Sequence, residues 1–481
     1  ASDVYKRQGF EIYDSNGQKI SMTFAYPTPT TIDTFYTNSE GYLITPEVLP
    51  YGEYLLVEVQ APYGYALDST PVSFTVSADN AEKENALTVI KVRKENTAQK
   101  GKISVQKTGD IFTSVNMASS AYTDENGELV VNSTTYTPVF ANGNLSGAVF
   151  QVIAAEDIVT LDGTVHANAG DVVAEITTDE NGYAETDLLY LGKYEIKEVQ
   201  APYGYVRNSE SQFVELTYAG QEIAVLDTVN ASFVNDYQSV EISLSKVMEN
   251  DELFGIGNNN EYLSVRFGLF AAEDIQAADG TVIPADGLLS EVSLDENMTA
   301  KFDVQIPFGR YYVQEIATDE HYVLNGEKYL VNFEYMGQDI RTVDIDCGQF
   351  VNLLKRGRIE GHKVDDKSEP LENAVFGLFT ADCVKFSRDT AVMTAASDEN
   401  GYFVFDEIPY GEYIIHEIET PTGYIFSDES YPVTVSEDGD VVEITAVNKP
   451  ITIEISKVNV YGEELIGAEM QLIDSEDNVV D

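Results

Sequence analysis

The alternation of apolar and polar residues along the chain predicts short β-strands from one end to the other. Four segments share one pattern, in which a glycine is followed by Tyr-x-apolar-x-Glu with a period of two residues. A polar turn such as Asp-Glu-Asn-Gly precedes each segment, and turns of this kind join the strands of β-hairpins. No stretch has a convincing helical period. The four segments are "YGEYLLVEV" at 51, "LGKYEIKEV" at 191, "FGRYYVQEI" at 308 and "YGEYIIHEI" at 410.

These segments belong to a longer repeat, and the repeat predicts the domain organisation. Each copy also has an earlier apolar strand, such as "GAVFQVI" at 147 or "AVFGLFT" at 374. Many short strands separated by turns are typical of β-sandwiches, so we expect an all-β fold of tandem sandwiches, joined by minimal linkers into a stiff rod. The predicted domains are unit one (9–100, N-terminally truncated), unit two (101–238, with an insertion at 111–146), unit three (239–355), unit four (356–450) and unit five (451–481, the start of a domain).

Both ends of the chain are expected to be cut within a unit. Unit one begins at "GFEIYD", in the middle of the repeat, and unit five stops near the same point. The leading "ASDVYKRQ" resembles translated sequencing-adapter read-through and not native protein, so residues 1–8 are left out of the fold prediction.

The composition allows packed cores and indicates a strongly acidic surface. Hydrophobic residues make up 43% of the chain, which is ample for sandwich cores. The 28 basic and 82 acidic residues give a formal net charge of −54, which argues against nucleic acid or an anionic membrane as a partner and for an extracellular type of surface. No transmembrane run is visible, so no membrane insertion is expected. The two cysteines, Cys347 and Cys383, fall in different units, which excludes a disulfide framework.

Three kinds of polar residue lie in phase with the apolar face of the strands. A glutamate follows the tyrosine and an apolar residue in each repeated segment, a lysine ends the first strand of a unit, and an asparagine ends the last. In unit five, Ile451, Ile453 and Ile455 precede the lysine in the same phase. The Glu-to-Asn spacings are 38, 37, 37 and 31 residues, whereas insertions fall between Lys and Glu. The residues are Glu58, Glu198, Glu315 and Glu417; Lys107, Lys246, Lys363 and Lys457; and Asn96, Asn235, Asn352 and Asn448.

A lysine, a glutamate and an asparagine that converge inside a sandwich form a reaction site. Burial of a lone charge is costly, and it lowers the pKa of lysine and raises that of glutamate. The neutral amine can then attack the asparagine carbonyl while a protonated carboxyl polarises that carbonyl and carries protons, so that ammonia leaves and an amide joins two strands. The alternative is a Lys–Glu salt bridge near the rim, or side chains that reach out to water. Three complete sets with matched spacing favour the cross-link.

The first-strand lysine, the "GAVF" strand, the "EVQAPYGY" segment and the final "VN" resemble collagen-adhesin B-type (Cna-B) domains of Gram-positive surface adhesins and pilins. The resemblance covers nearly all of residues 9–481. It implies an inverse-immunoglobulin, prealbumin-like sandwich with a spontaneous Lys–Asn isopeptide bond promoted by an acidic residue. For this chain it implies bonds Lys107–Asn235, Lys246–Asn352 and Lys363–Asn448, with Glu198, Glu315 and Glu417 as catalysts, Glu58 in the same role in unit one, and Asn96 and Lys457 unpaired.

Three positions leave details of these sites open. Asn96 fits the pattern poorly, because Lys94 occupies the preceding inward place. In unit three "ATDEHY" replaces the "APYGY" turn, so the orientation of Glu315 is open. In unit two Asp236 adjoins Asn235 and is the alternative acceptor, although the strand parity favours Asn235.

We expect the stalk of a cell-wall-attached adhesin or minor pilin, outside the cell and monomeric, and not an enzyme that acts on other molecules. The histidines build no triad or zinc site, and the polar turns lack the further acidic ligands of a calcium loop, so no metal or cofactor is expected. The resemblance implies sortase anchoring to peptidoglycan and a head that binds a host extracellular-matrix protein or glycan, both outside these residues. The alternative is a binding module, for which the Tyr-, Asn-, Ser- and Thr-rich insertion at 111–146 is the candidate surface, unless that insertion is a decorative hairpin.

Overall fold

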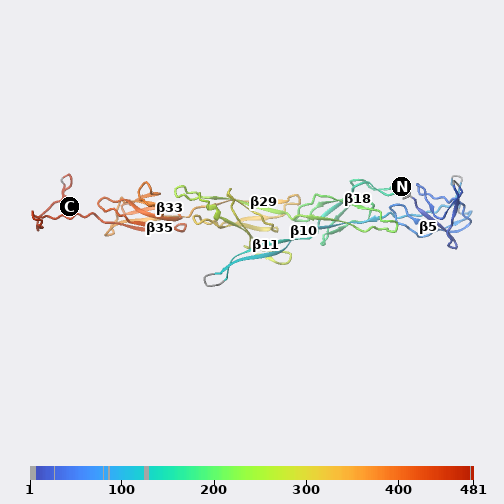
Figure 1. The fold of residues 1–481 in the computed structure, drawn as a ribbon, viewed down its shortest axis with the longest axis horizontal. Helices are drawn as coiled ribbons and strands as arrows, with labels where there is room; N and C mark the ends of the chain where they lie inside the picture. Colours follow the sequence, from blue (N-terminus) through green and yellow to red (C-terminus); the bar gives the residue numbers. More distant parts are fainter. Residues whose placement is uncertain are drawn as a thin grey trace.

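The computed structural model describes residues 7–25, 28–79, 81–84, 87–123, 129–476 and 478–480. These residues form a long rod of successive β-sheet units, with the two chain ends towards opposite ends of the rod (Figure 1). The described part of the chain holds one short 3-10 helix, Glu261–Ser264, and none of its helices is long and apolar enough to cross a membrane. The predicted all-β rod of tandem sandwiches is therefore confirmed.

Unit four has the arrangement that recurs along the rod, a three-stranded sheet packed on a four-stranded sheet. In the first sheet β30 (Arg356–Asp365) lies between β33 (Tyr402–Pro409) and β36 (Val441–Asn448), antiparallel to β33 and parallel to β36. The second sheet has the order β32-β31-β34-β35, with the glutamate strand β34 (Gly411–Glu419) at an inner position. Its other strands are β31 (Val375–Thr380), β32 (Met393–Ala396) and β35 (Ser430–Val435).

Units two and three have the same two sheets. In both, the first strand of the unit pairs in parallel with the last strand, and the glutamate strand lies inside the facing sheet. The strands of unit two are β10 (Ile103–Thr123), β16 (Tyr183–Glu185) and β20 (Val229–Asn235), facing β12 (Val149–Ala154), β15 (Val172–Thr177), β18 (Gly192–Gln200) and β19 (Gln212–Leu216). Those of unit three are β21 (Ser239–Met248), β26 (Thr299–Phe302) and β29 (Thr342–Asn352), facing β22 (Arg266–Ala271), β25 (Leu288–Ser293), β27 (Gly309–Ala317) and β28 (Tyr329–Phe333).

Unit one has a four-stranded sheet, and its described residues hold no counterpart of the three-stranded sheet. The sheet has the order β4-β1-β5-β6, formed by β4 (Phe35–Tyr36), β1 (Gly9–Asp14), β5 (Gly52–Gln60) and β6 (Val72–Val76). Short paired strands complete the rod: β2 (Met22–Phe24) with β3 (Thr30–Ile32), β7 (Glu82–Glu84) with β8 (Leu87–Val89), β9 (Lys100–Gly101) with β17 (Leu189–Tyr190), β13 (Ile158–Val159) with β14 (Val165–Ala167), and β23 (Ile275–Gln276) with β24 (Val282–Ile283).

Residues 451–457 do not form the inward-facing strand that the sequence pattern predicts for unit five. Ile451 and Ile453 are exposed, and so is Lys457. A strand needs neighbouring strands for its backbone hydrogen bonds and a facing layer for its apolar side chains. No described strand takes either role here, which explains why the prediction of an inward-facing strand is wrong.

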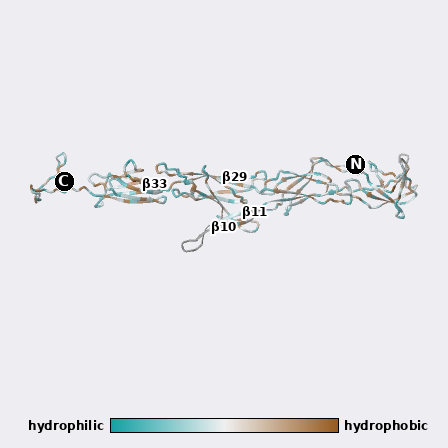
Figure 2. Ribbon diagram, in the orientation of Figure 1, coloured by the Kyte–Doolittle hydropathy of each residue, from teal (hydrophilic) through white to brown (hydrophobic). Residues whose placement is uncertain are grey.

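Each of the first four units has a hydrophobic cluster between or against its sheets. In unit four, Phe376 of one sheet stacks on Phe403 of the other, with ring centroids 4.1 Å apart. Figure 2 shows apolar and polar residues alternating along the strands of the whole rod, as expected where one face of each strand is buried. The polar side chains that the same clusters enclose are therefore the exceptions that need an explanation.

The insertion of unit two is a long β-hairpin, and its base supports unit three. Strand β10 continues past unit two and pairs with β11 (Leu129–Asn144). Val115 lies in the hydrophobic cluster of unit three, and Thr135 pairs with Leu288 of that unit. The outer part leaves the rod beside β11 (Figure 1), and residues 124–128 lie outside the described chain. The sequence predicts a decorative hairpin with no structural role. The base of this hairpin instead packs against unit three and pairs with it, and we call this part of the hairpin a brace.

Buried glutamines connect unit one to unit two and unit two to unit three. Gln238 follows the last strand of unit two, and its Nε2 donates to the carbonyl oxygens of Gly337 at 3.1 Å and Ile340 at 2.7 Å in unit three. Its Oε1 accepts the N–H of Met336 at 2.9 Å. Gln99 makes the equivalent contacts with unit two, and both side chains are fully buried.

A second glutamine at each of these junctions points the opposite way. The Oε1 atom of Gln338 in unit three accepts the N–H of Ala201 in unit two at 2.8 Å, and its backbone oxygen accepts that of Arg207 at 2.9 Å. Gln221 of unit two contacts Ala61 and Leu67 of unit one in the same way. Each pair of glutamines, which we call a glutamine latch, interlocks two neighbouring units and explains how short linkers can give a straight rod.

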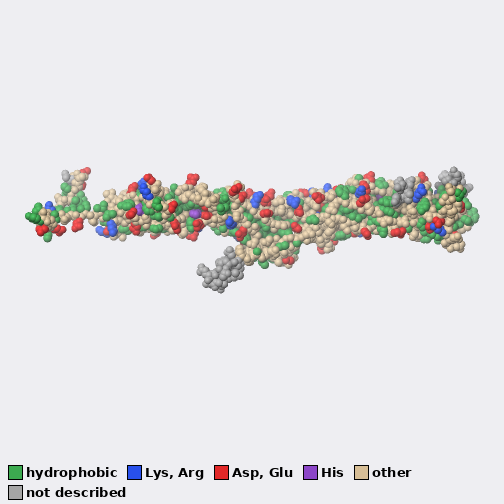
Figure 3. All heavy atoms as spheres, viewed as in Figure 1, with side chains coloured by type: hydrophobic (Ala, Val, Ile, Leu, Met, Phe, Trp, Pro, Cys, Tyr) green, Lys and Arg blue, Asp and Glu red, His purple; other side chains and the backbone are tan. Residues whose placement is uncertain are grey.

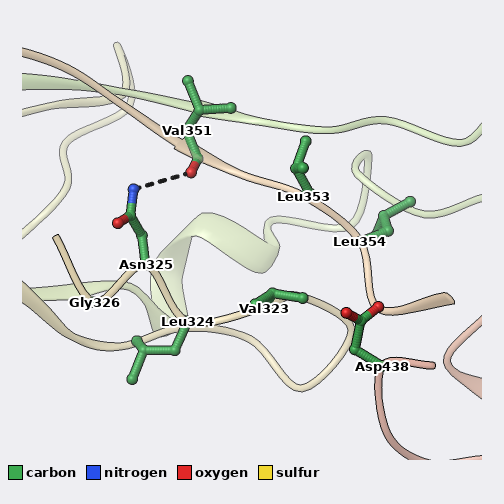
Figure 4. Close-up of a pocket in the computed structure, with 8 residues that line it drawn as sticks. All are labelled: Val323, Leu324, Asn325, Gly326, Val351, Leu353, Leu354 and Asp438. Carbon is green, nitrogen blue, oxygen red and sulfur yellow. Dashed lines mark hydrogen bonds between the residues drawn. The ribbon is translucent and has the colours of Figure 1, made fainter. Parts of the chain in front are cut away.

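The junction between units three and four uses charged groups instead. The Nη2 atom of Arg356 lies 2.9 Å from Glu249 and 3.1 Å from Asp251, and Phe254 of unit three packs edge-on against Tyr413 of unit four. A small pocket remains at this junction (Figure 4). It is lined by Val323, Leu324, Asn325, Gly326, Val351, Leu353, Leu354 and Asp438.

Replacing Gln99 with Ala should loosen the junction between units one and two. The carbonyls of Gly220 and Ile223 lose their donor, and a lost buried hydrogen bond costs about 1–3 kcal/mol. Small-angle X-ray scattering should show a shorter mean end-to-end distance than the unmodified chain. Gln238→Ala should have a smaller effect because the hairpin also holds that junction. Gln212→Ala, which removes an amide contact within unit two, is the control, and three identical scattering curves would contradict the latch.

Candidate intramolecular cross-link sites

Each complete site connects the two sheets of one unit. The lysine comes from the central strand of the three-stranded sheet, the asparagine from the parallel last strand, and the glutamate from the facing sheet. In unit two Lys107 pairs with Phe233, so Asn235, two residues further along, points to the same face. The register is the same in units three and four, where Lys246 pairs with Phe350 and Lys363 with Ala446.

The side chains of all three sites are buried. None of the nine residues has more than 3% of its surface exposed. They are therefore not salt bridges at a rim, and they do not reach out to water, which was the alternative that the sequence left open. The nine residues are Lys107, Glu198 and Asn235 in unit two, Lys246, Glu315 and Asn352 in unit three, and Lys363, Glu417 and Asn448 in unit four.

In unit three the three functional groups contact one another directly. Lys246 Nζ donates to Asn352 Oδ1 at 2.6 Å and lies 2.8 Å from Glu315 Oε1. Asn352 Nδ2 donates to the same Oε1 atom at 3.0 Å. One carboxyl oxygen therefore contacts both the amine and the amide nitrogen, while the amine lies beside the amide carbonyl.

Unit two has the same contacts. Lys107 Nζ donates to Asn235 Oδ1 and lies 3.1 Å from Glu198 Oε1, which accepts Asn235 Nδ2 at 2.9 Å. The neighbouring Asp236 is exposed and pairs with Arg341, so the structure brings Asn235 and not Asp236 to the lysine.

Unit four differs in how its carboxyl group is held. Lys363 Nζ donates to Asn448 Oδ1, and Asn448 Nδ2 donates to Glu417 Oε1 at 2.9 Å. The second carboxyl oxygen of Glu417 is buried with no described hydrogen-bond partner. In unit three the equivalent oxygen of Glu315 accepts the N–H of Asn325 at 2.8 Å, so the departure from the usual turn does not displace that glutamate.

The position of the carboxyl group corrects one expectation about the mechanism. From the sequence we expect this carboxyl to polarise the asparagine carbonyl, but in all three units Oε1 accepts a hydrogen bond from the amide nitrogen. A carboxyl in this position suits proton transfer between the attacking and leaving nitrogens. The polarity of the amide could not be predicted, since the two ends of a carboxamide have the same shape and their orientation depends on the partners.

Burial lowers the pKa of the lysine amine in all three sites, and the neighbouring carboxylate opposes that shift only in part. An amine with a lowered pKa is neutral over a wider pH range, and only the neutral amine has the lone pair needed for attack. The environment of each site therefore favours the reactive form of the nucleophile.

In unit one the acid and the amide lie together, and the described residues place a glutamine where the other sites have their lysine. Glu58 is buried, burial raises its pKa, and its Oε2 atom accepts Asn96 Nδ2 at 2.7 Å. Gln8, the last residue of the leading segment that the sequence sets apart from the repeats, donates its Nε2 to Asn96 Oδ1 at 2.8 Å. Lys94 pairs instead with Asp68 at 2.7 Å. Among the described residues at the unit-one site, a glutamine therefore lies where the other sites have their amine, and Lys457 of unit five is exposed.

Sequence reasoning missed one residue type at these sites. Asn352 Nδ2 also donates to Thr318 Oγ1 at 2.8 Å, and Asn448 Nδ2 donates to Thr420 Oγ1 at 2.6 Å. Both threonines lie three residues after the glutamate, where units one and two have Ala61 and Ala201. The signal in the sequence is Glu-x-x-Thr in place of Glu-x-x-Ala.

Comparison with known proteins agrees with this architecture. A family model of the SpaA prealbumin-like fold domain matches residues 6–91, 133–230 and 357–450, more than half of the chain. The collagen adhesin of Staphylococcus aureus is 23% identical over 262 residues, which cover 50% of this chain and 20% of that protein. The trypsin-resistant surface T6 protein of Streptococcus pyogenes serotype M6 is 26% identical over 145 residues, 30% of this chain and 26% of that protein. The chain thus spans about a quarter or less of these relatives.

A solved structure supports the fold. The TIE protein of Bacillus anthracis superposes with a TM-score of 0.51 at 19% sequence identity, over 92% of this chain and 68% of that one. At this level of identity the likeness concerns the arrangement of the β-sandwiches alone.

The lowered lysine pKa values predict how bond formation should depend on pH. The protonated amine cannot attack, so the rate should rise with pH and level off below about 10.4, the ordinary pKa of lysine. The measurement is the loss of ammonia from newly synthesised chain, quenched at intervals across buffers and followed by mass spectrometry. A rate that keeps rising until about pH 10.4 before it levels off would contradict a lowered pKa.

Proposed function

The chain belongs to the SpaA prealbumin-like fold domain family, and from this premise we propose that it is the stalk of a Gram-positive surface adhesin or minor pilin, stiffened by autocatalytic Lys–Asn isopeptide bonds. The domains of this stalk are the units defined above. The observation that carries the proposal is the threefold recurrence of a buried amine, carboxyl and carboxamide in direct contact. A buried charged pair is a weak source of stability by itself, so its repetition calls for another role.

The bond forms by aminolysis of the asparagine side chain. In unit three the neutral Nζ of Lys246 attacks Cγ of Asn352 to give a tetrahedral intermediate. Glu315 takes a proton from Nζ and delivers a proton to Nδ2, so the Cγ–Nδ2 bond breaks and ammonia leaves. The product is an amide between Nζ and Cγ, and no oxidant or cofactor is consumed. Each site reacts once, on its own chain, so the protein is not an enzyme for external substrates.

These bonds stabilise the fold by closing long loops. The linked residues are 128 positions apart in unit two, 106 in unit three and 85 in unit four. Chain-entropy estimates for disulfides that close loops of this length give roughly 4–5 kcal/mol each. That is a large addition to the typical stability of a domain, about 5–15 kcal/mol.

The bonds also give a covalent path for mechanical force. A pull on the rod enters each unit by its first strand and leaves by its last strand, and the proposed bond joins these two strands. The asparagine is the last residue of its strand in units two to four, immediately before the linker. Load can therefore pass from linker to linker without unpairing the sheets.

Location and partners follow from the family and from the charge. We place the chain outside the cell, attached to the wall through sortase signals that belong to other parts of the protein. Figure 3 shows acidic side chains spread along the visible face of the rod with few basic ones, which suits a solvated, monomeric spacer and not a nucleic-acid-binding surface. A host matrix protein or glycan would bind a head domain carried beyond the stalk.

The intact mass of the chain tests the chemistry. We expect a deficit of three ammonia molecules relative to the sequence, and Glu198→Gln, Glu315→Gln and Glu417→Gln should each restore one of them because the amide cannot carry the proton. Each loss should lower the free energy of unfolding of its unit by roughly 4–5 kcal/mol, measured by calorimetry. Glu58→Gln is the matched control, since the described donor to Asn96 Oδ1 in unit one is an amide group and not a lysine. An unmodified mass would remove the cross-links and leave the fold unaffected.

A second candidate function is a binding module on the hairpin of unit two. Its outer part leaves the rod (Figure 1), and residues 111–123 and 129–144 contain no charged side chain in a chain of net charge −54. Since one relative is named a collagen adhesin, collagen is the probe to use. If the hairpin binds it, deletion of residues 119–134, which spares the base at Val115 and Thr135, should abolish capture on immobilised collagen without changing the unfolding of units two and three. Equal capture by both chains, or none by either, would leave the stalk as the function.

A further inference from the structure

The leaving nitrogen of the proposed reaction has a second hydrogen-bond acceptor in two of the three sites. In unit three Asn352 Nδ2 donates to Glu315 Oε1 and to Thr318 Oγ1, at 3.0 Å and 2.8 Å. In unit four Asn448 Nδ2 donates to Glu417 Oε1 at 2.9 Å and to Thr420 Oγ1 at 2.6 Å. Both hydrogens of each amide group are thereby used.

Unit two has the same lysine, glutamate and asparagine without this hydroxyl. Ala201 stands in the place of the threonine, and the only described partner of Asn235 Nδ2 is Glu198. The backbone N–H of Ala201 is engaged by Gln338 in the glutamine latch. The chain therefore contains two kinds of site, which differ in one hydroxyl group at a matched position.

We propose that Thr318 and Thr420 are positioning residues for isopeptide formation, and that they hold the asparagine amide in the orientation that the reaction needs. The inference rests on the proposed function, because it concerns the rate of the bond-forming step. It assigns no new chemistry to the threonines, whose role is exerted through Asn352 and Asn448.

The need for such a residue follows from the symmetry of the carboxamide. A rotation of the Asn352 amide by half a turn would put its NH2 group against the Lys246 amine and its oxygen against Glu315. The amine would then face a donor, and the leaving nitrogen would lie away from the carboxyl that must protonate it. Glu315 alone can accept or, when protonated, donate, so it does not exclude the rotated form. The contact with Thr318 adds a second hydrogen bond to the nitrogen on that side, so two contacts and not one hold the amide in the observed orientation.

The threonine is also suited to the later stage of the reaction. In the amide the lone pair of the leaving nitrogen is delocalised into the carbonyl, and in the tetrahedral intermediate it becomes available as a hydrogen-bond acceptor. The threonine hydroxyl, which accepted a hydrogen bond before, can then donate one to this nitrogen. Thr is stiff at χ1, so the oxygen stays in place while its hydrogen turns. The proton that completes ammonia still comes from the glutamate, and the threonine keeps the nitrogen beside it.

Unit four should depend on its threonine more than unit three does. Glu315 is fixed by the N–H of Asn325 at 2.8 Å, whereas the corresponding oxygen of Glu417 has no described partner. Thr420 therefore contributes more to the positions of Glu417 and Asn448 than Thr318 does to those of Glu315 and Asn352. Loss of the threonine hydroxyl should therefore slow bond formation more in unit four than in unit three.

The test is a time course of cross-linking in the full chain. The chain is made by cell-free translation, quenched in denaturant at intervals and digested, and the cross-linked and free peptides of each unit are quantified by mass spectrometry. Thr318→Val should slow bond formation in unit three about tenfold, the effect of one lost hydrogen bond to the reacting group, and Thr420→Val should slow unit four by more. The unaltered units of each variant are the internal standards.

The conservative variants separate positioning from packing. Thr318→Ser and Thr420→Ser restore the hydroxyl and should return the rates to within about twofold of the original, whereas Val keeps the shape of Thr without the hydroxyl. If Val and Ser slow the reaction equally, or if Val does not slow it, the threonines are not positioning residues. Circular dichroism of each variant shows whether the unit is folded, and a fold lost in one unit leaves the other unit as the test.

The two proposals fail in different ways. If the unmodified chain forms no cross-linked peptide in units three and four, the isopeptide chemistry of the proposed function fails. If those peptides form in the unmodified chain and as fast in both Val variants, the stalk chemistry stands and the role of the threonines is refuted.

Discussion

The contact among a buried amine, carboxyl and carboxamide is the constraint on which units two, three and four depend. Two ionisable groups taken out of water are costly unless they are paired and hydrogen-bonded. The register of the parallel first and last strands supplies that pairing, since Lys246 and Asn352 point to one face and Glu315 approaches from the facing sheet. The asparagine-to-lysine and glutamate-to-asparagine segments therefore vary little in length from unit to unit, and long insertions are confined to the part of the chain between lysine and glutamate.

The same geometry explains where the insertions go. The lysine lies near the end of the first strand, beside the end of the last strand, so chain that follows the lysine emerges at the junction with the next unit. In unit two this chain is the hairpin whose Val115 enters the core of unit three. In unit three it is the segment after β21, where Asp251 pairs with Arg356 and Phe254 packs on Tyr413 of unit four. Both braces start next to a proposed cross-link, and that bond would anchor each of them.

The strands and the members of the sites could be predicted from the sequence, because both follow from period-two patterns and fixed spacings. The strand that carries Glu198 and the burial of Lys107 and Asn235 are examples. The inward strand at 451–457 was wrong, since a pattern shows which face a strand would bury and not whether another sheet is there to cover it. Thr318 and the latch residue Gln238 were missed, because an isolated polar residue in a turn has no period and its partners lie in another element or unit.

Unit one has a buried acid and amide in contact but differs from units two to four in the group that donates to the asparagine oxygen. It buries Glu58 beside Asn96 as the other units bury their acids, but the donor to the asparagine oxygen is the amide of Gln8. An amide nitrogen has no available lone pair, so this arrangement satisfies the same hydrogen bonds without any chemistry. Shape and hydrogen bonding are thus not enough to define the proposed reaction: the amine must be present, must be desolvated so that its pKa is lowered, and must meet an amide held with its carbonyl towards it. The first condition is met by Lys107, Lys246 and Lys363, the second by burial in the sandwich, and the third is met most completely where a threonine holds the nitrogen.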